Sequence, residues 1–265
     1  MSLTTLIVIA ANRDSTITFL QDRRCVKRNP PVCPQCQKTM VLVRTGQLRN
    51  PVFRCSSHRS EQMSQLSGSF WERTRVSLPL TVSVAWLWAF KVPIVQAVTA
   101  TGLSAPTVGQ WYSYYRDVCS HWLMENPYKI GGPGLIVEVD ESVIAKRKYH
   151  RGRLVRERWV FGGYCPTTKQ GFLQIAGYNG IARMNVQPPF QHLTVNHSQN
   201  FVNPINGACT NHIEVYWKNA KQRLKAMSGT VSSMLPSHLD EFMWREIHGK
   251  DSAQAFNNLF IHISE

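Results

Sequence analysis

The order of hydrophobic and polar positions predicts helices at both ends and in the middle of the chain, with strands between them. Residues 2–23 contain an apolar run that ends in the polar QDRR, which indicates one amphipathic helix. Residues 79–124 are mostly helical in pattern, and a last helical part begins near Asn211, with breaks around residues 228–237 and at Gly249. The segments LIVEVDES, RERWVFGGYC and GFLQIAGY, which precede that part, are typical of strands.

Two changes of pattern divide the chain into three regions. A loop-rich basic block with several prolines follows the first helix, runs to about residue 75 and contains four of the seven cysteines. The GGPG of residues 131–134 then separates the middle helices from the strands and is the clearest boundary. We therefore expect three domains, over residues 1–75, 76–130 and 131–265.

The middle region has the pattern of a helix-turn-helix. Pro93 suits the start of a helix, Gly102 falls in a turn, and Ser104 is a suitable N-cap for the segment APTVGQWYSYYRDV. If the second helix reads DNA, its outer face presents side chains at spacings of three and four. The candidates are Thr107, Gln110, Trp111 and Tyr114. The alternative is a plain helical hairpin with these aromatic side chains in its core.

Cysteine and histidine spacing in the first region predicts a zinc ribbon. Cys33 and Cys36 form C-P-Q-C, and after a further eighteen residues Cys55 and His58 form C-S-S-H. Two short-spaced ligand pairs at this separation close a tetrahedral zinc site. The alternative is that these cysteines are surface thiols beside an ordinary loop histidine. An odd number of cysteines, of which only the first pair is closely spaced, favours a reducing compartment over disulfides.

The excess of basic over acidic residues predicts a polyanionic partner. Thirty Lys and Arg stand against sixteen Asp and Glu in 265 residues, so the net charge is +14 at pH 7, and nucleic acid is the leading candidate. The excess has two centres, since residues 1–80 carry 12 basic and 4 acidic groups and residues 136–265 carry 15 and 10. Lys91 and Pro93 interrupt the most apolar stretch, which argues against a membrane span.

Carboxylates on an apolar strand open the third region. Alternation places Glu138 and Asp140 on one face of LIVEVDES, an arrangement suited to holding Mg²⁺ or Mn²⁺. The basic segment AKRKYHRGRLVRER follows at once, and a metal site beside a basic hairpin suits the cleavage or joining of a phosphodiester. The alternative is an exposed strand end with a solvated charge run. The hairpin residues expected to contact DNA are Lys146, Arg147, Lys148, Arg151 and Arg153.

Five segments occur along the chain in the order VEVDES, KRKYHRGR, WVFGGY, VNHSQNFVNP and GACTNHIEVYWKNAKQRLK. Together they resemble the ISXO-like DDE transposases, a family that includes the Merlin elements of animals. The N-terminal FLQDRRCV, the CPQC pair and the helix-turn-helix pattern resemble the accessory regions of these proteins. The resemblance implies an α/β fold with an RNase H-like catalytic domain, in which helices flank a mixed sheet.

The same resemblance implies cut-and-paste DNA transposition by two-metal phosphoryl transfer. By position, Asp140 matches the first catalytic acid and Glu214 the third, both as ligands of Mg²⁺ or Mn²⁺. The implied partner is double-stranded DNA at transposon ends, with a homodimer as the implied assembly and the nucleus as the location in a eukaryote. Glu214 also has a structural explanation, because Asn211 and Glu214 form a capping-box pattern and Glu214 and Lys218 an i,i+4 pair.

The second catalytic aspartate of this family has no counterpart in the chain. In these transposases it lies between the third strand and VNHS, whereas here GFLQIAGYNG reaches QHLTVNHS within about twenty residues. Between Asp140 and Glu214 the only acids are Glu141 and Glu157. A two-metal site that lacks one ligand of three loses affinity and geometry, so we expect a shortened catalytic domain with impaired activity.

Three interpretations therefore stay open. The chain is a transposase by descent, or a DNA-binding protein that keeps the zinc ribbon, the helix-turn-helix and the basic hairpin without nuclease activity, or a zinc-stabilised interaction scaffold. The length of the motif resemblance favours the first for lineage. The missing acid favours the second for chemistry.

Overall fold

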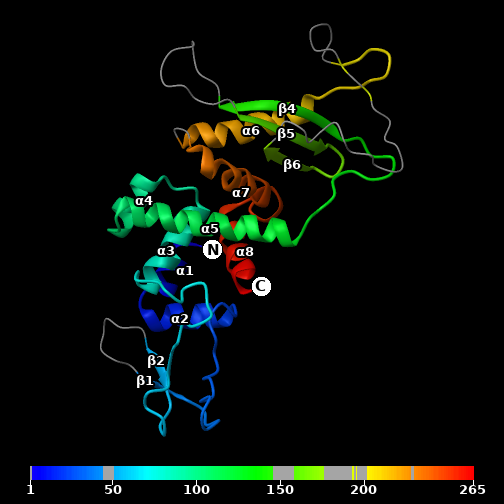
Figure 1. Ribbon diagram of the computed structural model, residues 1–265. Coiled ribbons are helices and arrows are strands. Elements are labelled where there is room, and N and C mark those ends of the chain that lie inside the picture. The colour runs from blue at the N-terminus through cyan, green and yellow to red at the C-terminus, as the bar shows by residue number, and fades with distance from the viewer. Residues whose placement is uncertain are drawn as a thin grey trace. The chain divides into compact units, whose positions relative to one another are not determined.

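The computed structural model describes residues 2–43, 51–145, 158–175, 193, 195, 202–227 and 230–265 (Figure 1). Within these residues the chain is mixed α/β, with eight α-helices and two three-stranded antiparallel sheets. It divides into two compact units, the first made of Met1–Val118 with His248–Glu265 and the second of Cys119–Ile247. These boundaries differ from the three expected regions, because the C-terminal helix belongs to the same unit as the N-terminus. No described helix is long and apolar enough to cross a membrane.

The N-terminal part of the first unit contains two short helices where the sequence predicted one. Helices α1 (Leu3–Ile9) and α2 (Arg13–Asp22) are separate because the Asn12 side-chain oxygen accepts a hydrogen bond from the Ser15 N–H at 2.9 Å and so caps a new helix. Helix α2 packs against α8 (Ser252–Ser264), with the Phe19 and Phe260 rings 5.1 Å apart. The prediction of a single helix over residues 2–23 is therefore wrong.

The first sheet is small and lies within the predicted zinc-ribbon region. Its strands β1 (Val41–Val43), β2 (Val52–Arg54) and β3 (Gln62–Ser64) pair antiparallel in chain order. Met40 and Phe53 form its buried core together with Cys33 and Cys55, and the partly buried Cys36 packs against them. A core this small cannot stabilise a fold by itself, which is the usual reason for a structural metal in such a module.

Three helices follow, and they confirm the helical prediction for the middle of the chain. They are α3 (Leu78–Ala89), α4 (Ile94–Thr101) and α5 (Ala105–Glu125). Gly102 ends α4 in the left-handed conformation with φ of 68°, and the Ser104 hydroxyl accepts a hydrogen bond from the Thr107 N–H at 3.4 Å at the start of α5. The Tyr115 hydroxyl, on α5, donates to the Thr81 carbonyl of α3 at 2.7 Å, so α5 is tied to α3.

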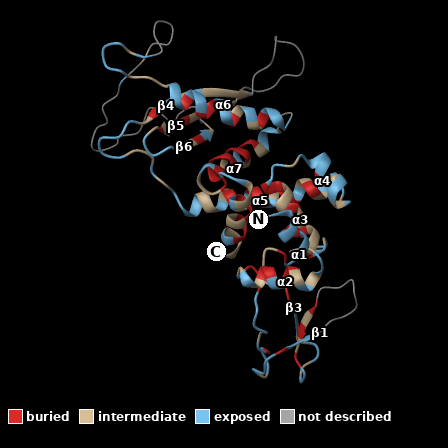
Figure 2. Cartoon of the chain, turned by 180° about the vertical axis from the view of Figure 1, so that it is seen from behind, coloured by how far each residue is buried: buried red, intermediate tan, exposed pale blue. Residues whose placement is uncertain are grey.

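The second unit places two helices on one face of the second sheet. Strands β4 (Glu138–Ala145), β5 (Arg158–Cys165) and β6 (Gln170–Ile175) confirm the three predicted strands and pair antiparallel in chain order. Helices α6 (Asn211–Ala226) and α7 (Leu235–His248), with the 3₁₀ turn Ser232–Met234 before α7, supply the rest of the unit's core. Figure 2 shows α6 buried along one side and exposed along the other.

The expected mixed sheet is not seen. All described pairings of β4, β5 and β6 are antiparallel, and no parallel strand lies within the described part of the chain. The structure therefore supports the α/β class and leaves the RNase H-like topology unconfirmed.

Candidate metal centre and nucleic-acid interface

The four predicted zinc ligands come together in the structure. The Cys33 Sγ lies 3.7 Å from the His58 Nδ1, and the Cys36 and Cys55 Sγ atoms are 3.6 Å apart. The Cys55 Sγ is 3.9 Å from the same Nδ1, and all four ligand atoms lie within 4.8 Å of one another. Ligands at the usual Zn–S distance of about 2.3 Å stand about 3.8 Å apart at the corners of a tetrahedron, so this arrangement fits a zinc ion.

Two turns with matching roles hold the ligands in place. In the first, the Cys33 N–H donates to the Lys38 carbonyl and the Gln37 N–H to the Cys33 carbonyl, both at 2.9 Å, with Gln37 at a φ of 58°. In the second, the Cys55 N–H donates to the Glu61 carbonyl at 3.2 Å. The Lys38 ammonium donates to the Ser57 hydroxyl at 3.2 Å and joins the two turns on the protein surface.

The electrostatics of the second turn favour the form of cysteine that binds metal. The His58 backbone N–H donates to the Cys55 Sγ at 3.3 Å, and this hydrogen bond is the main reason that the pKa of Cys55 falls to about 6. A thiolate rather than a thiol ligates zinc. The Cys55 side chain can therefore bind a metal ion as a thiolate near neutral pH.

The predicted DNA-reading face of α5 is only partly exposed. Gln110 and Tyr114 are exposed and Thr107 is half-buried, whereas the Trp111 side chain is 5 % exposed and packs against Phe70 with the ring centroids 6.0 Å apart. Trp111 is thus a core residue, as the alternative of a plain helical hairpin with aromatic side chains in its core predicted. Its place was not evident from spacing, because the loop before α3 that supplies Phe70 lies about forty positions earlier in the chain.

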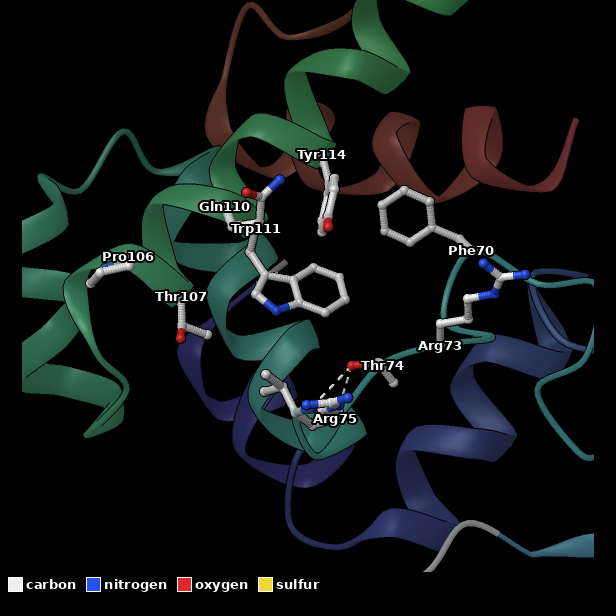
Figure 3. Close-up of a pocket in the computed structure, with 10 residues that line it drawn as sticks. Phe70, Arg73, Thr74, Arg75, Pro106, Thr107, Gln110, Trp111 and Tyr114 are labelled. Atoms are coloured by element: carbon white, nitrogen blue, oxygen red, sulfur yellow. Dashed lines mark hydrogen bonds between the residues drawn. The ribbon is translucent and has the colours of Figure 1, made fainter.

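That loop also brings two arginines to the exposed side of α5. Arg73 and Arg75 are both exposed, and they line an open pocket of about 460 Å³ whose other wall holds Gln110 and Tyr114 (Figure 3). Thr74, between the arginines, holds the loop by accepting from the Val76 N–H and donating to the Val76 carbonyl, each at 3.1 Å. Sequence reasoning counted these arginines in the basic block of residues 1–80 but did not name them as DNA contacts, because nothing local in the sequence places their loop beside α5.

The two predicted catalytic acids lie on neighbouring layers of the second unit. Asp140 is half-buried in β4 and pairs with Gly162 of β5. The Trp217 ring of α6 packs directly over Gly162, since a Cβ atom at Gly162 would lie 2.8 Å from the ring. Directly paired residues share a sheet face, so Asp140 lies on the face that α6 covers. Glu214 is exposed in the first turn of α6. Neither acid belongs to a potential metal-binding group of three among the described residues.

The neighbouring Glu138 has a different role from the one its position suggested. Its carboxylate is buried and accepts from the backbone N–H groups of His212 and Ile213 at 2.8 and 2.9 Å, while the His212 Nδ1 lies 2.6 Å from its other oxygen. Glu138 therefore caps the start of α6 from the sheet. The helix has Thr210 as its N-cap residue, so the expected capping box, with Asn211 in that place, is wrong.

The basic hairpin cannot be placed in the same way. Its expected DNA contacts, Lys146, Arg147, Lys148, Arg151 and Arg153, lie outside the described residues, as do Glu157 and the VNHS segment except for the Val195 backbone.

Comparisons with known proteins add no family to this description. No protein-family model matches the chain, and neither the curated proteins nor the solved structures searched include a match.

Proposed function

We propose that this protein is a zinc-stabilised DNA-binding protein of transposase descent, which reads duplex DNA with the first half of α5. The observation that carries the proposal is the juxtaposition around the α5 pocket, where two exposed arginines flank an exposed glutamine and tyrosine at the start of the second helix of a helix-turn-helix-like pair. Helices of this kind enter the major groove with their N-terminal residues.

The side chains of the pocket divide naturally between two kinds of contact. Arg73 and Arg75 are suited to phosphate oxygens, which position a protein on the duplex without reading sequence. Gln110 has the amide geometry for a bidentate pair with adenine, and Tyr114 adds a half-exposed ring and hydroxyl. The net charge of +14 supports the same partner.

For the second unit we propose descent from a transposase catalytic domain, with little of its activity retained. The motifs around Asp140 and Glu214 resemble ISXO-like transposases, and the antiparallel sheet covered by α6 is compatible with the beginning of an RNase H-like domain. In such a domain these acids would hold Mg²⁺ or Mn²⁺, which activates the attacking oxygen and stabilises the leaving one. We propose that this domain is shortened and poorly active. The buried Glu138 caps α6 and does not replace the missing acid.

Binding measurements on the full chain test the DNA-reading face. The variant that combines Arg73→Ala and Arg75→Ala should weaken binding to all duplexes alike and make the slope of log affinity against log salt shallower by about 2. Gln110→Ala should instead change the preferred sequence selected from a random duplex pool, with a discrimination loss of about 1–3 kcal/mol at one base pair.

Lys250→Ala is the matched control, because it removes one exposed cation from the same unit at a distance in sequence from the pocket. It should leave the preferred sequence unchanged. If the arginine pair and Lys250→Ala have equal effects, or if Gln110→Ala selects the wild-type sequence, α5 is not the reading helix.

A further inference from the structure

A second cluster of metal-ligand side chains lies in the second unit, outside the predicted zinc and catalytic sites. Glu138, Cys209 and His212 bring one carboxylate oxygen, one sulfur and one ring nitrogen within 4.8 Å of one another. The Glu138 Oε1 faces both partners, at 2.6 Å from the His212 Nδ1 and 3.8 Å from the Cys209 Sγ. A sulfur and a ring nitrogen thus both face one carboxylate oxygen.

The surroundings of the cluster fix two of the three ligands before any metal binds. The Glu138 side chain is 3 % exposed, and its Oε2 is held by two backbone N–H groups of α6, which leaves Oε1 directed at the cluster. Cys209 ends a tight hairpin closed by its bridge to Val202, and the Asn203 N–H donates to the Ala208 carbonyl at 2.8 Å inside it. Supporting hydrogen bonds of this kind orient the ligands in established metal sites.

The third ligand supplies the adjustment that a metal ion needs. Zinc ligands of nitrogen and oxygen stand about 3.4 Å apart, so the Nδ1 of His212 must move away from Oε1 by somewhat less than 1 Å. The His212 side chain is 55 % exposed and can rotate without disturbing the core. Because the His212 side chain is exposed to solvent, a water molecule can serve as the fourth ligand.

We propose that Glu138, Cys209 and His212 bind a divalent cation of the zinc type, with a fourth position open to solvent. A thiolate and an imidazole select such an ion over the hard Mg²⁺ or Mn²⁺ expected at Asp140. Binding clamps the hairpin 202–209 and the first turn of α6 to β4. The site is independent of the proposed DNA-reading face, which lies in the other unit.

Zinc content of the purified full chain tests the site by difference. The wild type should bind about two equivalents, and Cys209→Ser and His212→Asn should each bind one fewer, because each removes a ligand and keeps a polar side chain of similar size. Cys165→Ser, which changes a buried cysteine of the same unit outside both clusters, is the matched control and should retain the wild-type content. Far-ultraviolet circular dichroism identifies any variant that fails to fold.

Titration with Co²⁺ gives a second readout that does not depend on stability. A thiolate-to-cobalt absorption should develop in two steps in the wild type, and Cys209→Ser should abolish only one of them. The combined Cys33→Ser and Cys36→Ser variant should abolish the other. Equal zinc content and equal cobalt spectra for the wild type, Cys209→Ser and His212→Asn would overturn the proposal, whatever the chain's affinity for DNA.

Discussion

At the level of single residues, Glu138 and Asp140 lie two positions apart on β4 and have different surroundings. Both are on the sheet face covered by α6, as the alternation of the strand predicted. Their different environments could not be predicted, because Glu138 meets backbone N–H groups that lie 74 and 75 positions away in sequence. Trp111 is a similar case, since its burial depends on a distant loop.

Removing the Glu138 carboxylate should therefore destabilise the second unit. We expect Glu138→Ala to lower the free energy of unfolding by about 2–4 kcal/mol, because the partly buried His212 N–H and the buried Ile213 N–H at the start of α6 lose their acceptor. Urea titration followed by circular dichroism measures the change. Glu141→Ala is the control, since Glu141 is an exposed carboxylate three positions further along the same strand, and its effect should stay within about 0.5 kcal/mol. Equal effects for the two variants would contradict the capping role.

A pair of histidines in the first unit should make stability depend on pH. The His248 and His262 rings are 4.7 Å apart, and burial, with a smaller contribution from His248, lowers the pKa of His262 to about 4. Unfolded histidine titrates near 6.5, so between that pH and about 4 the unfolded state binds more protons than the folded state, and stability falls as the pH drops through this range.

The expected loss of stability from His262 is on the order of 1 kcal/mol, because its ring is half exposed and solvent screens the charge. Urea midpoints at pH 7.5 and pH 4.5 measure it. His262→Gln should reduce the difference between the two midpoints, whereas His121→Gln, at an exposed position, should not. A difference that is the same in wild type and His262→Gln would show that other groups control the pH dependence.

At the level of elements, the turn that holds Cys33 and Cys36 and the hairpin before α6 share one backbone pattern. Residues 32–39 and 202–209 are each closed by a bridge between their ends, and Gln37 and Gly207 occupy equivalent left-handed positions. Where the first turn has Cys33 and Cys36, the second has Asn203 and Asn206, whose side-chain oxygens accept from the Ile205 and Ala208 N–H groups at 2.9 and 3.0 Å. The second hairpin is therefore complete without a metal at its tip.

The elements that the sequence could predict are those whose signals are local. The C-P-Q-C and C-S-S-H spacings are local and specific, so the sequence found the four side chains that the structure brings together in a geometry able to hold a metal ion. The helix-turn-helix pattern was also local, and its Gly102 and Ser104 signals match the observed ends of α4 and α5. The break between α1 and α2 was missed because an Asn inside an apolar run is a weak signal until its side chain is seen to cap the next helix.

Loss of the zinc ligands should unfold the first sheet and leave the helices in place. Cys33→Ser with Cys36→Ser should remove one equivalent of zinc, and amide exchange should become fast in β1, β2 and β3, because little other than the metal stabilises so small a core. Elemental analysis and hydrogen-exchange mass spectrometry measure the two effects. Cys25→Ser, at a buried cysteine of the same unit outside the cluster, should leave both unchanged. Zinc content unaffected by the double substitution would exclude the site.

At the level of the whole molecule, the ligand count argues against efficient strand cleavage. Asp140 and Glu214 would need a third carboxylate to complete two metal shells, and Glu138 already holds the start of α6. We expect Mn²⁺-dependent nicking or transfer of a labelled end-sequence duplex by the wild type to be no greater than by Asp140→Ala. Robust activity that Asp140→Ala abolishes would show that an unrecognised ligand completes the site.

We propose that the chain is a DNA-binding protein whose positive charge neutralises phosphates. The most direct test is the affinity of the full-length wild type for duplex DNA, measured by fluorescence anisotropy at several salt concentrations. Each phosphate contact contributes about −0.9 to the slope of log affinity against log salt, and we predict a slope steeper than about −3, with one preferred sequence bound more tightly than the rest. A slope near zero, or no binding at low salt, would contradict the account and favour an interaction scaffold.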